Sequence, residues 1–348
     1  MLEHVASLRC RDCGEDFRPA HRARCPQCEG GGALRYGYRT DHRARFDRGR
    51  WAKREAWLWR YRELLPFDDD LDPPPLHVGA TPLYGSPALA RHCGVRGLFV
   101  KDESRNPTGR IADRAAAVVM AQQGAGPFVC GALAASAAAF AASAGRALIA
   151  LRTPGEPAAG FGAHTLWLEP ALDRDRALLA LADDGFALAD RPHPLAFEGL
   201  KTLGLELGDQ LAERLPDWVA LDAQVPELVE AVAEGLSQCA ALGLFERAPR
   251  ILAVGGSGGD AQVPGDPAGC EAASRAAQRA LGLPIPPSGA RVLAGLAQAV
   301  REGVVSPDAL ALAVVQAPTE PPGLAWTPGE ALPNYDRLRA AARAAFGR

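Results

Sequence analysis

The chain has 348 residues, of which 48% are hydrophobic and 23% are charged, a balance typical of a globular protein with a buried core. The formal net charge of −3 argues against a protein that coats nucleic acid or acidic membranes through its overall charge. No apolar run reaches the roughly 18 residues that a membrane-spanning helix needs. The N-terminus also lacks the basic and apolar regions of a secretory signal. We therefore expect a cytoplasmic protein with two domains and a small appendage.

Two Cys-x-x-Cys pairs lie near the N-terminus, separated by eleven residues. They consist of Cys10 with Cys13 and Cys25 with Cys28. Each pair places two thiolates on one tight turn, and two such turns complete a tetrahedral zinc site. The spacing predicts a zinc ribbon over residues 1–35. Because four cysteines leave no open coordination position, the expected role of the zinc is structural.

Residues 36–77 form a predicted arm and linker. The first 62 residues carry 15 Arg and Lys against 8 Asp and Glu, and tryptophans are interleaved with the basic stretch 36–62. Such a stretch can contact phosphates, so a zinc-ribbon nucleic-acid-binding protein is one alternative. The acidic balance of the remaining chain favours an arm that packs its aromatic side chains on the body, and we expect no nucleic-acid partner.

From Val78 onward, short apolar runs alternate with alanine-rich helical segments. Strands are expected near residues 98–100, 128–130, 147–151, 165–168, 218–221, 251–254 and 311–316. Helices are expected near residues 112–123, 134–144, 197–214, 226–241 and 287–302. Strands alternating with helices of this length predict an α/β fold with parallel sheets covered by helices on both faces.

The body contains five short motifs with specific residues in a fixed order. They are Gly79-Ala80-Thr81-Pro82-Leu83, Val100-Lys101-Asp102-Glu103, Asn106-Pro107-Thr108-Gly109, Glu198-Gly199-Leu200-Lys201-Thr202 and Pro216-Asp217-Trp218-Val219. In this order they resemble threonine synthase and related pyridoxal-phosphate (PLP) enzymes of fold type II. The resemblance implies a three-layer body over residues 78–348, built from two α/β subdomains, with the smaller one at about 110–195.

The resemblance also implies a lysine that holds PLP as a Schiff base and moves the proton at the substrate α-carbon. In the family this lysine lies three residues after the glycine of Asn-Pro-Thr-Gly. Here that position is Ala112. The chain has three lysines, and two of them, Lys101 and Lys201, match family positions other than the Schiff-base residue. The sequence therefore predicts that PLP is not bound.

Three further positions depart from the cofactor site that the family implies. Ala132 replaces the asparagine of the loop that contacts the pyridine ring, and Gln316 falls at or near the residue that bonds the pyridine nitrogen. The phosphate-loop position, residues 220–227, includes Gln224 and contains no glycine. A loop of the substrate-binding region is shortened to residues 155–160. These departures together predict the loss of the cofactor pocket.

A residual pocket is expected at Asn106, Thr108, Arg110 and Arg114, where Arg110 either fills the vacated space or binds a small anion. The first hypothesis is a pseudoenzyme with a binding, regulatory or scaffolding role. It would act as a homo-oligomer or as the partner of an active paralogue. The alternative within the family is a PLP-dependent lyase or threonine synthase-type enzyme with an unusual site.

Overall fold

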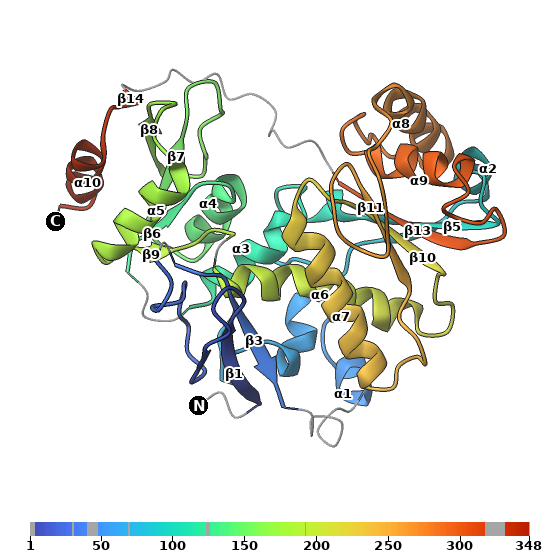
Figure 1. Ribbon diagram of the computed structural model, residues 1–348, viewed down its shortest axis with the longest axis horizontal. Helices are drawn as coiled ribbons and strands as arrows, with labels where there is room; N and C mark the ends of the chain where they lie inside the picture. The colour runs from blue at the N-terminus through green and yellow to red at the C-terminus, as the bar shows by residue number, and fades with distance from the viewer. Residues whose placement is uncertain are drawn as a thin grey trace.

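The computed structural model describes residues 4–29, 31–39, 48–68, 70–122, 126–191, 193–316 and 331–347. Its body contains a larger and a smaller sheet with helices packed on their faces, and a small antiparallel unit precedes them (Figure 1). The α/β class expected from the alternating pattern is confirmed. None of the described helices is long and apolar enough to cross a membrane.

The larger sheet has the strand order β12-β11-β10-β13-β5-β4, and its strands are parallel except for the edge strand β4. The strands are β4 (Leu83–Gly85), β5 (Gly97–Asp102), β10 (Trp218–Asp222), β11 (Arg250–Val254), β12 (Ala261–Val263) and β13 (Leu310–Val315). Successive side chains of a strand point to opposite faces. Val219 and Leu221 therefore join one hydrophobic core, whereas Trp218 and Ala220 join the other.

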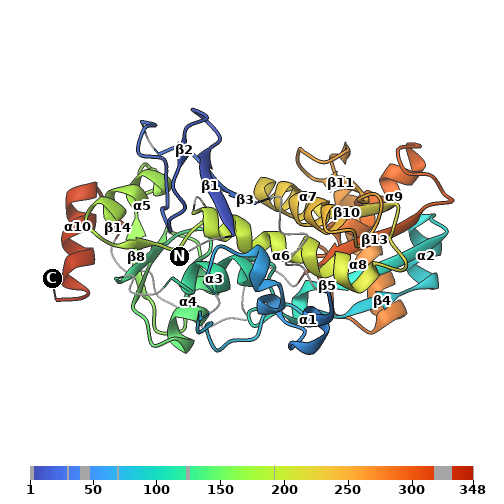
Figure 2. The ribbon, with the colours of Figure 1, turned by 90° about the horizontal axis from the view of Figure 1, so that it is seen from below.

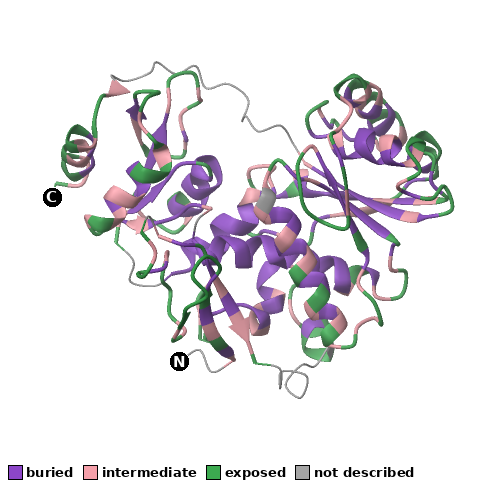
Figure 3. Cartoon of the chain, in the orientation of Figure 1, coloured by how far each residue is buried: buried purple, intermediate pink, exposed green. Residues whose placement is uncertain are grey.

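Helices cover both faces of the larger sheet. On one side lie α2 (Pro87–Cys93), α8 (Pro267–Leu281) and α9 (Arg291–Arg301). On the other side lie α6 (Pro194–Leu211) and α7 (Pro226–Ala241), which run alongside each other through the middle of the molecule (Figure 2). The helix α3 (Ala112–Met120) packs on α6 and links the two sheets. Buried residues are concentrated in these central helices and in the strands (Figure 3).

The smaller sheet is entirely parallel, with the order β14-β8-β7-β6-β9. The strands are β6 (Phe128–Cys130), β7 (Leu148–Arg152), β8 (His164–Leu168), β9 (Ala187–Leu188) and β14 (Ala331–Leu332). Its faces are covered by α4 (Ala134–Ser143) on one side and by α5 (Arg174–Asp183) and α10 (Tyr335–Ala344) on the other. The C-terminal residues thus return to this sheet, so the smaller unit extends beyond the expected range of about 110–195.

The N-terminal unit has the strand order β2-β1-β3, formed by β1 (Val5–Cys10), β2 (Asp16–Phe17) and β3 (Leu34–Tyr38). Because β3 pairs with β1 as far as Tyr38, the antiparallel unit continues past residue 35. The arm then forms α1 (Arg48–Lys53) and a 3₁₀ helix over Leu58–Leu64. Trp51 and Trp59 are buried against the body, as expected for a packed arm. Residues 40–47 of the basic stretch lie outside the described residues.

Two predicted helices have different starting points in the structure. The helix expected near 197–214 starts at Pro194, where the ring of His193 accepts the N–H of Leu195 at 3.1 Å. Proline suits this first turn because its missing N–H would have no partner inside the helix. The helix expected near 287–302 starts only at Arg291, since the preceding prolines form a turn that closes on the N–H of Ala290.

Candidate functional site

Four cysteines of the N-terminal unit converge on one point. The sulfurs of Cys10, Cys13, Cys25 and Cys28 all lie within 4.8 Å of one another. Gly32 leaves room for this cluster, because a Cβ there would lie 2.8 Å from the sulfur of Cys10 and 2.9 Å from that of Cys28. Four thiols at this separation match the donor set of a structural zinc ion, so the residues present fit that metal.

The Glu-Gly-x-Lys-Thr motif on α6 joins the N-terminal unit to the body. Lys201 is fully buried, pairs with Glu198, and lies 4.1 Å from the ring centre of Tyr38. Its ammonium also donates to the carbonyl of Leu64 at 2.9 Å, while the hydroxyl of Tyr38 donates to Glu198. Gly199 permits close helix packing, because a Cβ there would lie 2.2 Å from the carbonyl oxygen of α3 at Arg114. The motif is therefore structural in this chain.

A second buried charge network lies where α3 meets α6 and β5. Arg114 donates to Glu103 at 2.7 and 2.8 Å and to Glu206 at 2.9 Å, and all three side chains are at most 1% exposed. Lys101 pairs with the same Glu206 and donates to the carbonyl of Thr81 at 2.6 Å. These charges neutralise one another, which a buried ion needs in a medium of low dielectric constant.

The residues of the expected residual pocket take separate places. Asn106 donates to Glu103 at 2.7 Å, and Arg114 belongs to the same buried network. The hydroxyl of Thr108 donates to Asp113 at 2.6 Å, directly beside the start of α3. Arg110 is half-buried in the turn before that helix. Two of these four residues therefore belong to a structural network, and the other two lie at the turn that leads into α3.

Ala112 is the first residue of α3 and is half-buried. The N–H of its neighbour Ile111 points to the side-chain oxygen of Gln316 at 3.4 Å, so Gln316 lies next to this helix start. Neither body lysine can take over the role of position 112, because Lys101 and Lys201 are fully buried in ion pairs elsewhere. The remaining lysine, Lys53, is exposed at the end of α1.

The loop between β6 and α4 already holds an anion from within the chain. The carboxylate of Asp190 accepts the N–H groups of Gly131 at 2.6 Å, Ala132 at 2.9 Å and Leu133 at 3.2 Å. Asp190 is 1% exposed, and burial raises the pKa of its carboxyl. The start of a helix attracts negative charge, and here Asp190 satisfies the amides of the loop that contains Ala132.

The connection between β10 and α7 carries two carboxylates, each paired with an arginine. Asp222 pairs with Arg291 at 3.4 Å and accepts the N–H of the exposed residue Gln224 at 3.1 Å. Glu227 in the first turn of α7 lies 3.9 Å from Arg191. The connection also contains no glycine that would let its backbone approach a phosphate closely. With no lysine at position 112 and with Asp190 on the loop amides, the residues present do not fit PLP as the family would hold it.

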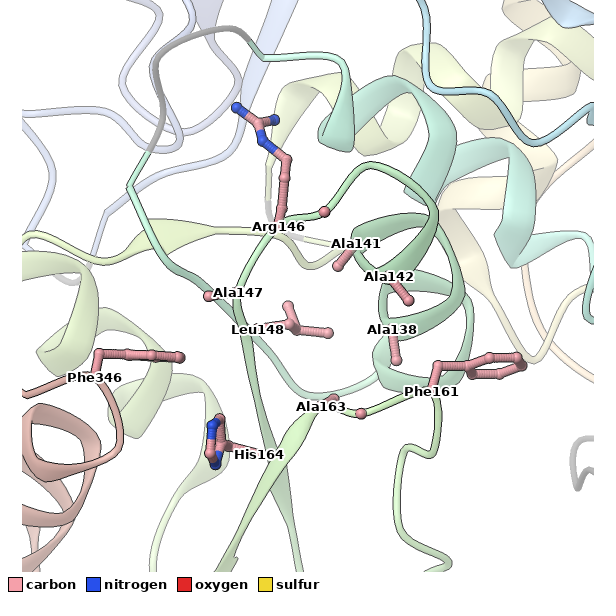
Figure 4. Close-up of a pocket in the computed structure, with 12 residues that line it drawn as sticks. Ala138, Ala141, Ala142, Arg146, Ala147, Leu148, Phe161, Ala163, His164 and Phe346 are labelled. Atoms are coloured by element: carbon pink, nitrogen blue, oxygen red, sulfur yellow. The ribbon is translucent and has the colours of Figure 1, made fainter.

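A surface hollow of about 290 Å³ lies on the smaller unit (Figure 4). Alanines of α4 line one side of it, and His164 and Phe346 lie on the other. Arg146 at its rim donates to the carbonyl of Met120 at 2.7 Å and is therefore engaged in the fold. The lining includes neither Ala112, Ala132, Gln224 nor Gln316, so this hollow is separate from the position of the family's cofactor.

Comparison with known proteins identifies the family. Residues 75–315 match the family described as pyridoxal-phosphate dependent enzyme, and the chain belongs to this family. Relatives include the threonine synthases of Methanosarcina acetivorans and Methanocaldococcus jannaschii, each 28% identical over 267 residues, or 72% of this chain. The aligned part spans 65% of each of those relatives. The resemblance to threonine synthase read from the motifs is confirmed.

Solved structures of this family share the fold. The threonine deaminase of T.th. superposes with a TM-score of 0.57 at 18% identity, covering 71% of this chain and 94% of that protein. Maize serine racemase superposes with a TM-score of 0.54 at 18% identity, covering 67% of this chain and 86% of that one. At these identities the likeness shows only that the chain has the fold of type II PLP enzymes. The chemistry of this chain has to be argued from its own residues.

Replacing Asp190 by Ala is expected to destabilise the protein by about 1–3 kcal/mol, because four backbone N–H groups, those of the three loop residues and of Arg191, lose their acceptor. Asp190→Asn keeps one side-chain oxygen and should lose less. Urea unfolding followed by circular dichroism measures both variants. A loss close to zero for Asp190→Ala would show that the loop amides do not depend on this acceptor.

Proposed function

We propose that this member of the PLP-dependent family works without a Schiff base, as a pseudoenzyme that binds or regulates a partner. The observation that carries the proposal is Ala112 at the start of α3, together with the burial of Lys101 and Lys201 in ion pairs. Alanine offers neither a nucleophile nor a transferable proton, and chemistry of this kind needs both within bonding reach.

Two other features support the same proposal. Asp190 takes the amides of the β6–α4 loop and so competes for hydrogen-bond donors. The β10–α7 connection carries two carboxylates, each paired with an arginine, and contains no glycine that would let its backbone approach a phosphate.

The N-terminal unit holds a structural zinc ion in this proposal. Its four cysteines supply a closed tetrahedral donor set, and the unit has few buried apolar residues of its own. Zinc would keep β1 and β3 in the shape that docks Tyr38 onto α6. The body then presents a fixed surface to its partner, which would be a second copy of the chain or an active relative.

The decisive experiment is an absorbance spectrum of purified protein incubated with PLP, before and after borohydride. We expect no Schiff-base band and no covalent pyridoxyl group in the wild-type protein, because no amine is available at position 112. A visible band that borohydride converts into a pyridoxyl-lysine in the wild-type protein would overturn the proposal, and peptide mapping would identify the lysine.

The matched variants are Ala112→Lys and Ala112→Met, which have similar length but differ in the amine. We expect neither to form a stable Schiff base, since Asp190 remains on the loop amides and the β10–α7 connection remains without glycine. The double variant Ala112→Lys with Asp190→Asn should bind PLP more tightly than Ala112→Lys alone. Full cofactor binding by Ala112→Lys alone would show that only the anchor has been lost.

A further inference from the structure

The carboxyl ends of three neighbouring strands meet at one edge of the smaller sheet. Cys130 ends β6, Arg152 ends β7, and Asp190 follows β9 after one residue. Ligands of parallel α/β sheets bind at this edge, where the loops leave the strands. The backbone N–H groups at this edge donate hydrogen bonds to Asp190. The nearby side chains of Arg152 and Arg174, by contrast, each have a buried N–H without a hydrogen-bond partner.

Arg152 is a buried cation with too few partners. Its side chain is 9% exposed, its one ion-pair contact in the described part of the chain is with Glu156 at 3.8 Å, and it makes no hydrogen bond there. Its Nε is buried without a partner. Burial lowers the pKa of this guanidinium, and the nearby Glu156 only partly opposes that effect. A guanidinium has five N–H donors, and such donors normally have hydrogen-bond partners when they are buried.

Arg174 reaches the same place from α5. Its guanidinium donates to Glu156 at 2.6 Å and to the hydroxyl of Thr153 at 3.4 Å, while its Nε is buried without a partner. Gly131 makes room for its stem, because a Cβ there would lie 2.6 Å from the Cδ of Arg174. Two arginines from different elements therefore converge on one carboxylate, which is the arrangement that recognises an oxyanion.

The carboxylate of Glu156 lies between the two arginines and is partly exposed to solvent. Glu156 lies on the short loop after β7 and is 32% exposed, whereas Arg152 behind it is nearly buried. Its carboxylate is divided among Arg174, Thr153 and the more distant Arg152. Asp190 does not neutralise Arg152 through a hydrogen bond, because its oxygens accept backbone N–H groups.

We propose that Arg152 and Arg174 form a binding site for a small oxyanion of the carboxylate or phosphate type. The oxyanion accepts hydrogen bonds from the guanidinium N–H groups of Arg152 and Arg174 that Glu156 does not accept. It reaches them from solvent beside the exposed part of Glu156. The site lies on the smaller sheet and needs no cofactor, so it does not depend on the absence of a Schiff base.

The experiment titrates the full-length protein with inorganic phosphate and, separately, with acetate. Ionic strength is held constant with chloride, and binding is followed by calorimetry and thermal unfolding. We expect one of the two anions to bind and to raise the unfolding temperature. Arg152→Met should unfold at the same or a higher temperature than wild type without anion, because a buried charge whose one ion-pair contact in the described residues is a carboxylate 3.8 Å away is gone. It should bind the anion roughly tenfold more weakly or not at all.

Arg174→Met should weaken binding similarly, which provides a second test if Arg152→Met folds poorly. Arg176→Met is the matched control, since Arg176 is exposed on the same helix two residues away. It should leave anion binding unchanged. The acetate and phosphate arms distinguish a carboxylate ligand from a phosphate ligand. The proposal is overturned if neither anion binds the wild-type protein, or if both methionine variants bind it as the wild type does.

Discussion

Replacing Arg114 by Met is expected to remove a large part of the stability of the body. Arg114 is fully buried and donates to two buried carboxylates, Glu103 and Glu206. Methionine fills similar space but leaves those carboxylates with fewer compensating charges. Breaking a buried ion pair from one side costs about 3–5 kcal/mol, which is a large part of the roughly 5–15 kcal/mol that stabilises a typical protein.

Urea unfolding at neutral pH measures this loss, and the chain offers a matched control. Arg275 also forms an ion pair, with Glu271 at 3.2 Å, but both side chains are exposed, at 59% and 70%. Exposed pairs contribute about 0–1 kcal/mol. Arg275→Met should therefore unfold close to the wild-type midpoint. A similar small loss for Arg114→Met would show that the network is not a main source of stability.

The loss of stability caused by Arg114→Met should depend on pH in a definite direction. Burial would raise the pKa of Glu103, but Arg114, with smaller contributions from Lys101 and the hydroxyl of Thr81, outweighs burial and lowers this pKa from 4.5 to about 2. A carboxyl whose pKa is depressed by folding stabilises the folded state above its unfolded pKa. That stability is lost as pH falls from 4.5 toward 2. The difference between wild type and Arg114→Met should therefore be largest at neutral pH and should shrink across this interval.

The sequence indicated which motifs are present but not which residues they contact. Glu103 lies within one of the motifs that resemble the family, whereas Glu206, the other partner of Arg114, lies in none of them and is 92 residues from Arg114. A glutamate in a helix normally suggests an exposed position. Its burial follows from the packing of α6 against α3 and β5, which sequence patterns do not specify.

The candidate site could be predicted only in part, because the sequence again does not specify contacts between distant residues. The missing lysine at Ala112 follows from spacing alone, but the anchoring of the neighbouring loop by Asp190 was missed. Asp190 stands in a short polar turn that reads as solvent-exposed. The available signal was its position directly after a short apolar strand, since neighbouring parallel strands end at the same edge.

Several helices of the body were also missed, and their capping residues could have revealed them. The first turn is capped by Ser86 in α2, by Asp173 in α5, by Asp266 in α8 and by Asn334 in α10, each accepting a backbone N–H three residues on. Serine, aspartate and asparagine at such positions signal helix starts. The alanine-rich composition weakens the apolar periodicity that would otherwise mark these helices.

Removing zinc is expected to unfold the N-terminal unit, because metal binding supplies about 10–16 kcal/mol in comparable structural sites. Purified protein should contain one zinc ion per chain, and Cys25→Ala should contain almost none. Cys25 is 2% exposed and its sulfur belongs to the four-cysteine cluster. Metal analysis by mass spectrometry and limited proteolysis of residues 1–38 measure the two effects.

Cys93→Ala is the matched control, since Cys93 is equally buried at 2% exposure but lies in α2, far from the cluster in sequence. It should keep its zinc and its resistance to protease. The loss of the N-terminal unit should also weaken the body, because Tyr38 would leave Glu198 and Lys201, a buried pair on α6. We therefore expect a lower unfolding temperature for the whole Cys25→Ala protein. Full zinc content in Cys25→Ala would rule out this cluster as the metal site. An unchanged unfolding temperature would show instead that the N-terminal unit and the body are stable independently of each other.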